Sequence, residues 1–308
     1  MADDVVVALD VGGTGIKCAL VDSAGRVRHG ERHPTAPQRG PDAVVTTILD
    51  LSADLADTAG RTGLRPRAVG VVVPGIVDEA SGVAVWSANV GFRDVPLREL
   101  VGKRLGVPAA LGHDVRAGGL AEARLGAGRG YRHVLVVPIG TGIAAAHVVD
   151  GQVFTGAHGA AGELGHIVVR PGGPPCGCGL RGCLEAVASA AAVARRYAER
   201  AEDAAGADRV AALAASGDPV AAAVWHEAID ALADGLLTGL ALFDPEALVV
   251  GGGLAEAGDA LLDPLGRALR ARLTFHREPA LFRAALGDGA GVLGAALIAQ
   301  DALNRECA

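Results

Sequence analysis

One short pattern occurs twice in this chain of 308 residues, at 13–16 and again at 140–143, and reads GTGI in both places. An apolar run precedes each copy, VVVAL at 5–9 and VLVV at 134–137, and a second apolar run follows it. Apolar runs of this length that end at glycines are typical of buried strands, so each copy predicts a β-hairpin. Because the pattern occurs once in each half, we predict a duplicated α/β fold with two lobes around a central cleft.

The glycine turns have the composition of phosphate-binding loops. Glycine lets backbone N–H groups approach phosphate oxygens closely, and a threonine hydroxyl adds a further donor. Asp10 ends the first apolar run, where its carboxylate can hold Mg²⁺ directly or through water. An ordinary tight hairpin is the alternative for either copy taken alone. The residues predicted to contact phosphate are Gly12, Gly13, Thr14, Gly140, Thr141 and Gly142, together with Asp10 as the magnesium ligand.

Three of the five cysteines, Cys176, Cys178 and Cys183, lie close together, and His166 precedes them. Thiolates and imidazole are ligands that Zn²⁺ prefers, and four of them form a closed tetrahedral shell without room for water. Three reduced, buried cysteines are the alternative, and a disulfide is disfavoured because Cys176 and Cys178 are too close to bridge without strain. We therefore predict a structural zinc site. Residues 177–182 also spell GxGxxG, but no strand precedes them, so no dinucleotide site is predicted.

The segment around these cysteines resembles a known signature. GAAGE at 159–163 precedes the spacing GH-x9-CxCGxxGCxE, which is similar to that of the ROK family of sugar kinases and related repressors. The resemblance implies an actin-like ATPase (ribonuclease H-like) fold and ATP-dependent phosphorylation of the 6-hydroxyl of a hexose, with glucose as the default acceptor. It divides the chain into a smaller lobe, 1–115 joined by a C-terminal helix at 290–308, and a larger lobe at 116–289 that carries the zinc loop.

Asp114 is the candidate catalytic base. A strand predicted at 107–112 is followed at once by a helix from Val115, and a strand-to-helix junction is a usual place for an active-site group in α/β sheets. A helix N-cap is the alternative role for this aspartate. In the ROK family the matching aspartate lies in the sequence Asn-Asp-Ala-Asn and is the base. Here His113 and Arg116 replace the two asparagines, which puts the identity of the acceptor sugar in doubt.

The resemblance also implies the remaining contacts with substrates. The loop WSANVGF at 86–92 matches the family's asparagine loop, although an asparagine alone is more often a turn residue. His166 is expected to use one ring nitrogen for zinc and the other for the sugar. The glycines after the strand at 247–250 are expected to lie against adenosine. The implied sugar-binding residues are Asn89, Asp114, Glu163, His166 and Glu185, and the implied adenosine-binding residues are Gly251, Gly252 and Gly253.

Composition excludes several classes of protein. The net charge of −7 and the absence of a Lys/Arg cluster argue against nucleic-acid binding, and no apolar run is long enough to span a membrane. Cysteines committed mostly to metal fit a reducing, cytoplasmic compartment, with Cys307 as an incidental free thiol. Alanine-rich amphipathic helices predicted at 186–203 and 219–243 are assigned to packing and to the interface of a homodimer or homotetramer.

Several alternatives stay open within this resemblance. The acceptor can be an N-acetylated amino sugar such as N-acetylmannosamine, and polyphosphate can replace ATP as the donor. A sugar-binding protein that has lost the chemistry is a third possibility, given the changes around Asp114. A sugar-responsive repressor needs a helix-turn-helix ahead of the kinase-like core. Since the first hairpin begins near residue 10, we do not expect a repressor.

Overall fold

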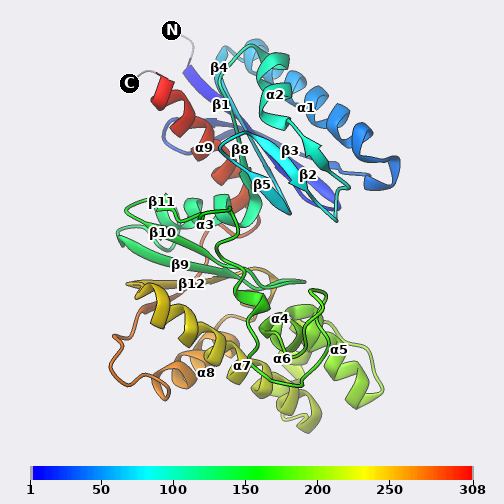
Figure 1. Cartoon of the computed structure of the whole chain (residues 1–308), viewed down its shortest axis with the longest axis vertical. Helices are drawn as coiled ribbons and strands as arrows, with labels where there is room; N and C mark the ends of the chain where they lie inside the picture. The colour runs from blue at the N-terminus through cyan, green and yellow to red at the C-terminus, as the bar shows by residue number, and fades with distance from the viewer. Residues whose placement is uncertain (1–2, 307–308) are drawn as a thin grey trace. The chain divides into compact units, whose positions relative to one another are not determined.

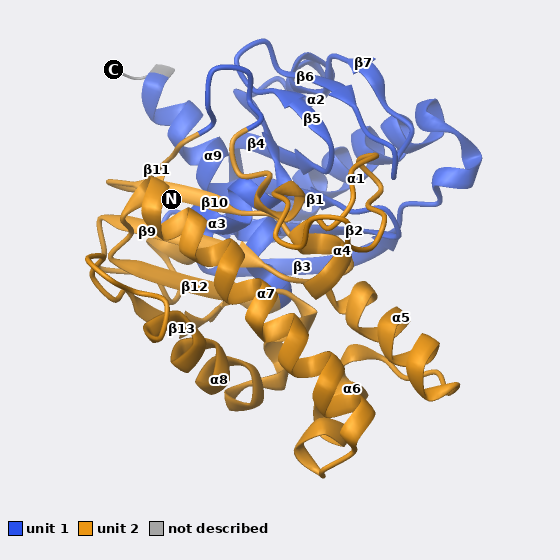
Figure 2. Ribbon diagram, turned by 60° about the horizontal axis from the view of Figure 1, so that its bottom comes forward, with its two compact units in different colours: residues 1–121, 155–160, 288–308 blue, residues 122–154, 161–287 orange. Residues whose placement is uncertain are grey.

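The computed structural model of the chain describes residues 3–306 and divides them into two compact units (Figure 2). Unit 1 consists of residues 3–121, 155–160 and 288–306, and unit 2 of residues 122–154 and 161–287. Cys307, the expected free thiol, lies outside the described residues.

Unit 1 is built on a five-stranded sheet of order β3-β2-β1-β4-β8 (Figure 1). The first three strands are antiparallel, and β4 and β8 run parallel to β1. The hairpin predicted from the first GTGI is confirmed, with Val11 opposite Ile16. The strands are β1 (Asp3–Val11), β2 (Gly15–Asp22), β3 (Val27–Pro34), β4 (Leu64–Val73) and β8 (Ala109–His113). A smaller sheet contains β5 (Ile76–Asp78), β6 (Val83–Trp86) and β7 (Arg93–Val95).

Both faces of the large sheet in unit 1 are buried. Side chains alternate along β1, so that Val5, Val7 and Leu9 join the core beneath α1 and α2 while Val6 and Ala8 join the core beneath α9. Glycine permits the close approach of α9, since a Cβ at Gly70 would lie 1.9 Å from the Ala295 carbonyl oxygen. The helices are α1 (Pro41–Arg61), α2 (Leu97–Leu105), α3 (Asp114–Arg124), which begins in this unit, and α9 (Ala290–Glu306), with 3₁₀ turns η1 (Pro37–Arg39) and η4 (Gly287–Gly289).

Unit 2 repeats the same design. Its sheet has the order β11-β10-β9-β12-β13, with three antiparallel strands followed by two parallel ones. The strands are β9 (His133–Pro138), β10 (Ala146–Val149), β11 (Gln152–Val153), β12 (Ala247–Gly251) and β13 (Ala280–Arg283). An Ile139–Ile143 bridge closes the second predicted hairpin. The matching strand orders confirm the duplication that the two GTGI copies predicted.

The helices of unit 2 pack around the long helix α7, whose bounds agree with the predicted range 219–243. The single helix predicted at 186–203 is wrong, because the chain breaks at Ser189. The Ser189 hydroxyl accepts a hydrogen bond from the Ala192 N–H at 3.1 Å and caps a new helix. The helices are α4 (Leu184–Ala188), α5 (Ala190–Ala201), α6 (Ala207–Ala215), α7 (Pro219–Phe243) and α8 (Asp259–Arg270), with 3₁₀ turns η2 (Leu164–His166) and η3 (Gly253–Ala257).

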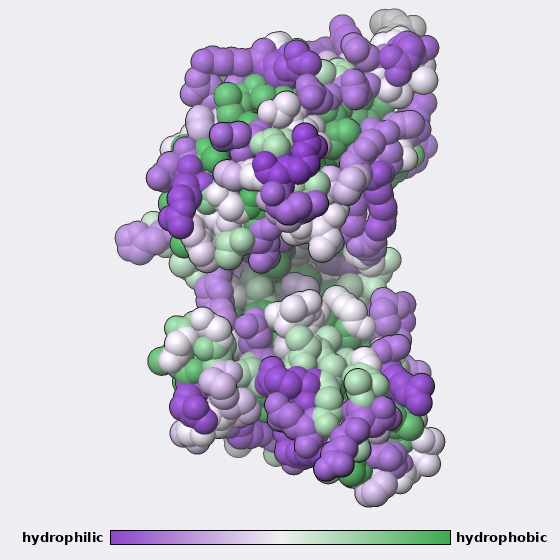
Figure 3. All heavy atoms as spheres, turned by 90° about the vertical axis from the view of Figure 1, so that its right-hand side faces the viewer, coloured by the Kyte–Doolittle hydropathy of each residue, from purple (hydrophilic) through white to green (hydrophobic). Residues whose placement is uncertain are grey.

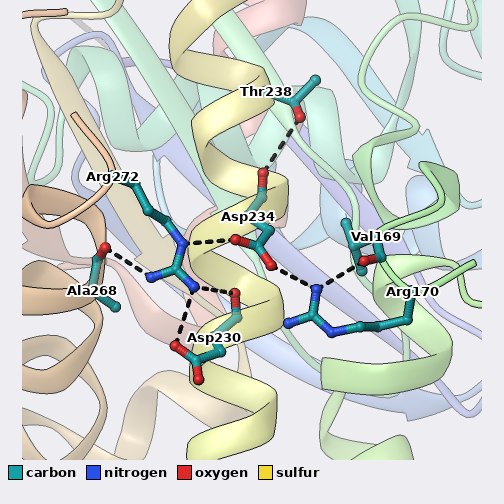
Figure 4. A network of polar contacts seen from close by, with 7 residues as sticks. All are labelled: Val169, Arg170, Asp230, Asp234, Thr238, Ala268 and Arg272. Atoms are coloured by element: carbon teal, nitrogen blue, oxygen red, sulfur yellow. Dashed lines mark hydrogen bonds and ion pairs between the residues drawn. The ribbon is translucent and has the colours of Figure 1, made fainter. Parts of the chain in front are cut away.

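A charged network ties α7 to its neighbours in unit 2 (Figure 4). The Asp234 carboxylate accepts hydrogen bonds from Arg170 at 2.6 Å and from Arg272 at 2.7 Å. Arg272 also donates to Asp230, one turn earlier on α7. Although burial raises the pKa of Asp234, the hydrogen bonds from the two arginines hold it below the ordinary value. Asp234 therefore joins the segment after His166 to the α7–α8 pair.

Hydrophilic side chains cover most of the face drawn in Figure 3, with hydrophobic ones between them. Within residues 3–306 no helix combines the length and the apolar composition that crossing a bilayer requires.

Candidate functional site

The first glycine turn lies between β1 and β2, and a residue outside the motif holds it. The Gly12 N–H donates to the Gly15 carbonyl at 2.8 Å. Thr35, which is buried, donates from its hydroxyl to the Gly12 carbonyl at 2.6 Å and from its N–H to the Thr14 carbonyl at 3.1 Å. Thr14 itself is exposed at the tip of the turn. The buried Thr35 therefore fixes the backbone of the turn, while the tip of the turn remains accessible to a ligand.

Asp10, near the end of β1, lies among charged side chains. Its carboxylate lies 3.4 Å from the Lys17 Nζ, and Lys17 also pairs with Asp288, which in turn pairs with Arg32. Helix α9 approaches Asp10 at Gly291, where a Cβ would lie 2.4 Å from the carboxylate oxygen. Glycine at this position is thus required for the helix to pack beside the carboxylate.

Burial raises the pKa of Asp10 above the ordinary aspartate value. The Lys17 charge opposes this shift, and the negative charge of Asp114 adds to it. Unit 1 thus brings together two carboxylates whose charges act on each other, one near the end of β1 and one directly after β8, with β4 between these two strands in the sheet. Two carboxylates in this arrangement can serve a divalent cation and a proton acceptor separately.

Asp114 is the first residue of α3 and follows β8 directly. Its Oδ1 accepts a hydrogen bond from the Val115 N–H at 2.7 Å and lies 3.3 Å from the His113 Nδ1. Burial raises the pKa of Asp114, while the Val115 hydrogen bond and the Arg116 charge oppose the rise. The helix-capping role and the proposed role as a base therefore do not exclude each other. A raised pKa moves a carboxylate toward the range in which it accepts protons efficiently.

Asn89 lies beside the first glycine turn within unit 1. A Cβ built on Gly13 would meet the Asn89 Cβ at 3.3 Å. The loop that carries Asn89 is closed by two backbone hydrogen bonds, from Ser87 to the Phe92 carbonyl and from Gly91 to the Ser87 carbonyl. The Asn89 side chain is exposed at the tip of this loop. It is therefore available to a ligand next to the turn.

The second glycine turn is held by a carboxylate. The Gly140 N–H donates to the Gly142 carbonyl at 2.9 Å, and Glu185 Oε2 accepts from the Ile143 N–H at 2.9 Å. A Cβ on Gly142 would lie 2.5 Å from that same oxygen, so glycine is needed for Glu185 to approach. Glu185 comes from the first turn of α4, and its predicted sugar contact would have to use its remaining acceptor capacity.

The glycines at 251–253 lie against the second turn. The Ile139 N–H donates to the Gly251 carbonyl at 2.8 Å, and the Leu254 N–H donates back to the Ile139 carbonyl at 2.9 Å. Gly252 has a φ of 76° and its added Cβ would lie 2.5 Å from the Ile139 oxygen. Only glycine fits this position, so unit 2 places its two predicted nucleotide-binding segments side by side.

Glu163 directly precedes the short 3₁₀ helix η2, and His166 is the last residue of that helix. The Glu163 carboxylate is 3.8 Å from the His166 Nε2 and is largely exposed. Gly162 and Gly165 let this segment pack against residues 143–145, because added Cβ atoms would lie 2.0 Å from the Ala145 oxygen and 2.1 Å from the Ile143 oxygen. The segment is thereby attached to the strand that follows the second turn.

The four predicted zinc ligands meet in one place in unit 2. One ligand atom from each of His166, Cys176, Cys178 and Cys183 lies within 4.8 Å of all the others. The Cys176 sulfur is 3.5 Å from His166 Nδ1, and the Cys178 and Cys183 sulfurs are 3.6 Å apart. This sulfur–sulfur distance is far too long for a disulfide bond between Cys178 and Cys183, in agreement with the expectation that no disulfide forms here.

The spacing of these atoms fits Zn²⁺. Sulfur ligands placed tetrahedrally around zinc at ordinary bond lengths are separated by about 3.8 Å. Burial and the neighbouring thiols raise the pKa of Cys183 to about 12, while a backbone hydrogen bond from Leu180 lowers the pKa of Cys178. A bound cation would remove the proton from a coordinating thiol outright. The donor set and its geometry therefore agree with a closed, structural site.

The loop between the ligands depends on two glycines with left-handed backbone. Gly179 has a φ of 92° and allows the turn in which its N–H donates to the Cys176 carbonyl. Gly182 has a φ of 76°, and a Cβ there would lie 1.6 Å from the Arg170 carbonyl oxygen. Gly177 has no such backbone conformation. Of the glycines interspersed with the cysteines, the one at 177 is thus not required for the loop geometry.

Some residues of the site have no signal in the sequence motifs. Thr35 contacts the first turn, Lys17 and Gly291 lie against Asp10, and Asp288 pairs with Lys17, but none of these residues belongs to the glycine motif. Lys17 directly follows the first GTGI, and its partner in the antiparallel register is Asp10. That cross-strand pair is the one that strand pairing alone could have revealed.

Comparisons with known proteins agree with this geometry. Residues 6–302 match the sequence profile of the ROK family. The chain is 32% identical to the glucokinase of Thermotoga maritima over 320 residues, covering 97% of this chain and 98% of that relative. It is 33% identical to the N-acetylmannosamine kinase of Citrobacter koseri over 303 residues, covering 95% of this chain and 98% of that relative.

The fold is also shared with a solved structure. A ROK family glucokinase from Streptomyces griseus, in complex with glucose and AMPPNP, superimposes with a TM-score of 0.80 at 31% identity and covers 96% of this chain and 99% of its own. The predicted actin-like α/β fold is confirmed by this match together with the duplicated sheets. The glycine turns, the cysteine–histidine cluster and these similarities lead to one assignment: the chain belongs to the ROK family.

Proposed function

We propose that this protein is an ATP-dependent hexose kinase that phosphorylates the 6-hydroxyl of glucose, with Asp114 as the general base. The observation that carries the proposal is the pair of carboxylates in unit 1 whose charges act on each other, Asp10 just before the first glycine turn and Asp114 at the β8–α3 junction. Similarity over nearly the whole chain to proteins named glucokinase supports the choice of reaction and acceptor.

In this mechanism the protein mainly positions the reactants. The exposed tips of the two glycine turns offer backbone N–H groups and the Thr14 and Thr141 hydroxyls to the phosphates. Asp114 accepts the proton of the sugar hydroxyl as its oxygen forms a bond to the γ-phosphorus, and the bond from that phosphorus to ADP breaks. Asp10 would hold the Mg²⁺ that accompanies ATP, and the ion would there neutralise phosphate charge.

The sugar is proposed to bind through Asn89, Glu163, His166 and Glu185. His166 directs Nδ1 toward Cys176 and has Nε2 near Glu163. A zinc ion on Nδ1 would hold the imidazole in one orientation and leave Nε2 for the sugar. His166, Cys176, Cys178 and Cys183 would hold the zinc ion, whose role would be to fix the conformation of the loop.

A second acceptor class is favoured by a specific departure in this chain. His113 stands where the ROK motif carries an asparagine, and its ring lies against the proposed base. The similarity to an N-acetylmannosamine kinase is of the same order as that to glucokinases. An N-acetylated amino sugar is therefore the second candidate acceptor, and polyphosphate the second candidate donor.

A coupled assay with ATP over hexoses and N-acetylhexosamines tests the proposal, with Asp114→Asn measured beside the natural chain. We expect turnover on glucose that falls by about 10²–10⁴-fold in the variant, while the Kd for glucose changes little. Turnover on an amino sugar alone keeps the mechanism and changes the acceptor. Near-full turnover by Asp114→Asn would show that the base is another group.

The pH profile gives a second check on Asp114. Because burial raises its pKa, the carboxylate becomes protonated at a higher pH than an ordinary aspartate does. The unprotonated form is the active one, so kcat/KM should fall as the pH drops through this raised pKa and stay level above it. A profile whose acidic limb is unchanged in a variant lacking the Asp114 carboxyl would assign the limb to a different group.

A further inference from the structure

Arg116 is a buried charged residue that the proposed reaction leaves without a role. It lies two residues after Asp114 in the first turn of α3, and its side chain is only 6% exposed. Its Nε donates to Glu79 Oε1 at 2.9 Å, and its Nη1 donates to the Gly159 carbonyl at 2.7 Å. A buried guanidinium needs partners of this kind, because an unpaired buried charge is strongly destabilising. The side chain thus links α3 to two other segments of unit 1.

The first of these segments is itself firmly held. Glu79 follows β5, and its Oε1 also lies 3.3 Å from the His113 N–H, so that it contacts the residue before Asp114 as well as Arg116 after it. Asp78 closes the turn by accepting hydrogen bonds from the N–H groups of Ala80 and Ser81. Glu79 is therefore held in place, and it orients the Arg116 side chain.

The second segment, residues 155–160, has a bent backbone and makes little apolar packing contact. Gly156 and Gly159 have φ values of 73° and 67°, and a Cβ on Gly159 would lie 3.2 Å from the Val77 carbonyl oxygen. A cavity of about 410 Å³ lies beside it, lined by residues 155–159 together with Glu79 and Arg116. A segment that borders empty space gains little from apolar packing, so the hydrogen bond from Arg116 has a large share in holding it.

We propose that Arg116 is a positioning residue that fastens residues 155–160 to the α3 helix carrying the base. The chain continues from this segment to Glu163 and His166. If the segment became more mobile, these two proposed sugar-binding side chains would sample more orientations. This inference rests on the proposed kinase function. It concerns an arginine at a position where the ROK motif carries an asparagine. Asparagine has a shorter side chain and a single donor group, whereas arginine donates from three nitrogens.

Kinetics and limited proteolysis of Arg116→Met test this role together. Methionine keeps much of the apolar stem but removes every donor. We expect the sugar KM and the sugar Kd measured without ATP to rise about tenfold, with kcat reduced less than about threefold. Thermolysin should cleave before Ala157 or Ala160 faster than in the natural chain, because cleavage follows local opening. Arg116→Lys keeps a charge opposite Glu79 but cannot serve both partners, so its values should be intermediate.

Arg98→Met is the matched control. Arg98 donates to the carbonyls of Glu79, Ala80 and Ser81, so the variant loosens the anchoring turn without touching Gly159. It should leave cleavage of residues 155–160 unchanged. An unchanged sugar KM in Arg116→Met, or equal cleavage in both variants, overturns the proposal. If Arg116→Met does not fold, the sugar KM and the cleavage rate of residues 155–160 in Arg116→Lys test the proposal instead. If the natural chain phosphorylates no sugar, the kinase proposal fails while the proteolysis result still decides whether Arg116 holds the segment.

Discussion

The two glycine turns have the same four letters but not the same chemistry. In unit 1, the Gly12 N–H closes the turn onto Gly15 and a buried threonine holds it from behind. In unit 2, the corresponding N–H, that of Ile139, instead donates to Gly251, and the turn closes between Gly140 and Gly142. The tertiary neighbours of each turn therefore decide how the common sequence is closed.

The two turns differ more in the charged residues beside them than in their backbone hydrogen bonds. The first turn is preceded by Asp10 and followed by Lys17, which pair across the strands. The residues at the same offsets from the second GTGI are Val137, which is fully buried, and Ala144. The duplication thus supplies backbone N–H groups twice, whereas the carboxylate and the ammonium group occur at one copy. Unit 1 carries the two aspartates of the proposed site, and unit 2 carries Glu163, Glu185 and the cysteine–histidine cluster.

The largest effect is expected where the two turns differ in charge. Asp10→Asn should reduce kcat by about 100-fold or more, because the proposed magnesium ligand is lost, and should leave the melting temperature nearly unchanged. Val137→Ala, at the matching position of the second turn, should have the opposite effect. It should lower the free energy of unfolding by about 2 kcal/mol and leave kcat unchanged. Steady-state kinetics and thermal melts of both variants measure this. Equal losses of kcat would show that the turns are functionally alike.

A second effect should be confined to the metal cluster of unit 2. Chelation, or Cys183→Ser, should remove bound zinc and lower the melting temperature by roughly ten degrees, with a rise in sugar KM through His166. Metal analysis of the purified protein should give one zinc per chain. Cys18→Ser is the control, since Cys18 is also buried but lies in the core of unit 1. Full thermal stability in a metal-free protein would rule out a structural role for the cluster.

The smallest effect concerns the backbone of the second turn itself. Gly142→Ala places a Cβ 2.5 Å from the Glu185 carboxylate, whereas Gly140→Ala meets nothing within 4 Å. Because the Glu185 side chain can shift, we expect only a several-fold rise in the KM values for Gly142→Ala, and little change for Gly140→Ala. Initial-rate measurements over both substrates compare the pair. Indistinguishable variants would mean that the contact with Glu185 does not shape the turn for catalysis.

Much of the fold could be read from the sequence because it follows from local patterns. Continuous apolar runs ending at glycine predict both hairpins, and an alanine-rich amphipathic pattern predicts α7, whereas the C-terminal helix α9 is expected from the resemblance to the ROK family. The break at Ser189 was missed because alanine-rich sequence on both sides continues the helical pattern, and one hydroxyl cap ends it. Residues 155–160 carry no local sign of joining unit 1, because their attachment depends on Arg116.

For this protein, the sequence by itself determined the features that depend on residue type and spacing: the duplicated strands, the glycine turns and the grouping of three cysteines with a histidine. Ligand chemistry and strand periodicity are local properties, so they survive in a linear pattern. The tertiary structure alone decided that Thr35 supports the first turn, that Asp288 and Gly291 lie beside Asp10, and that Arg116 binds Gly159. These contacts join residues distant in the chain, and only the packing of the sheet against its helices brings them within hydrogen-bond distance.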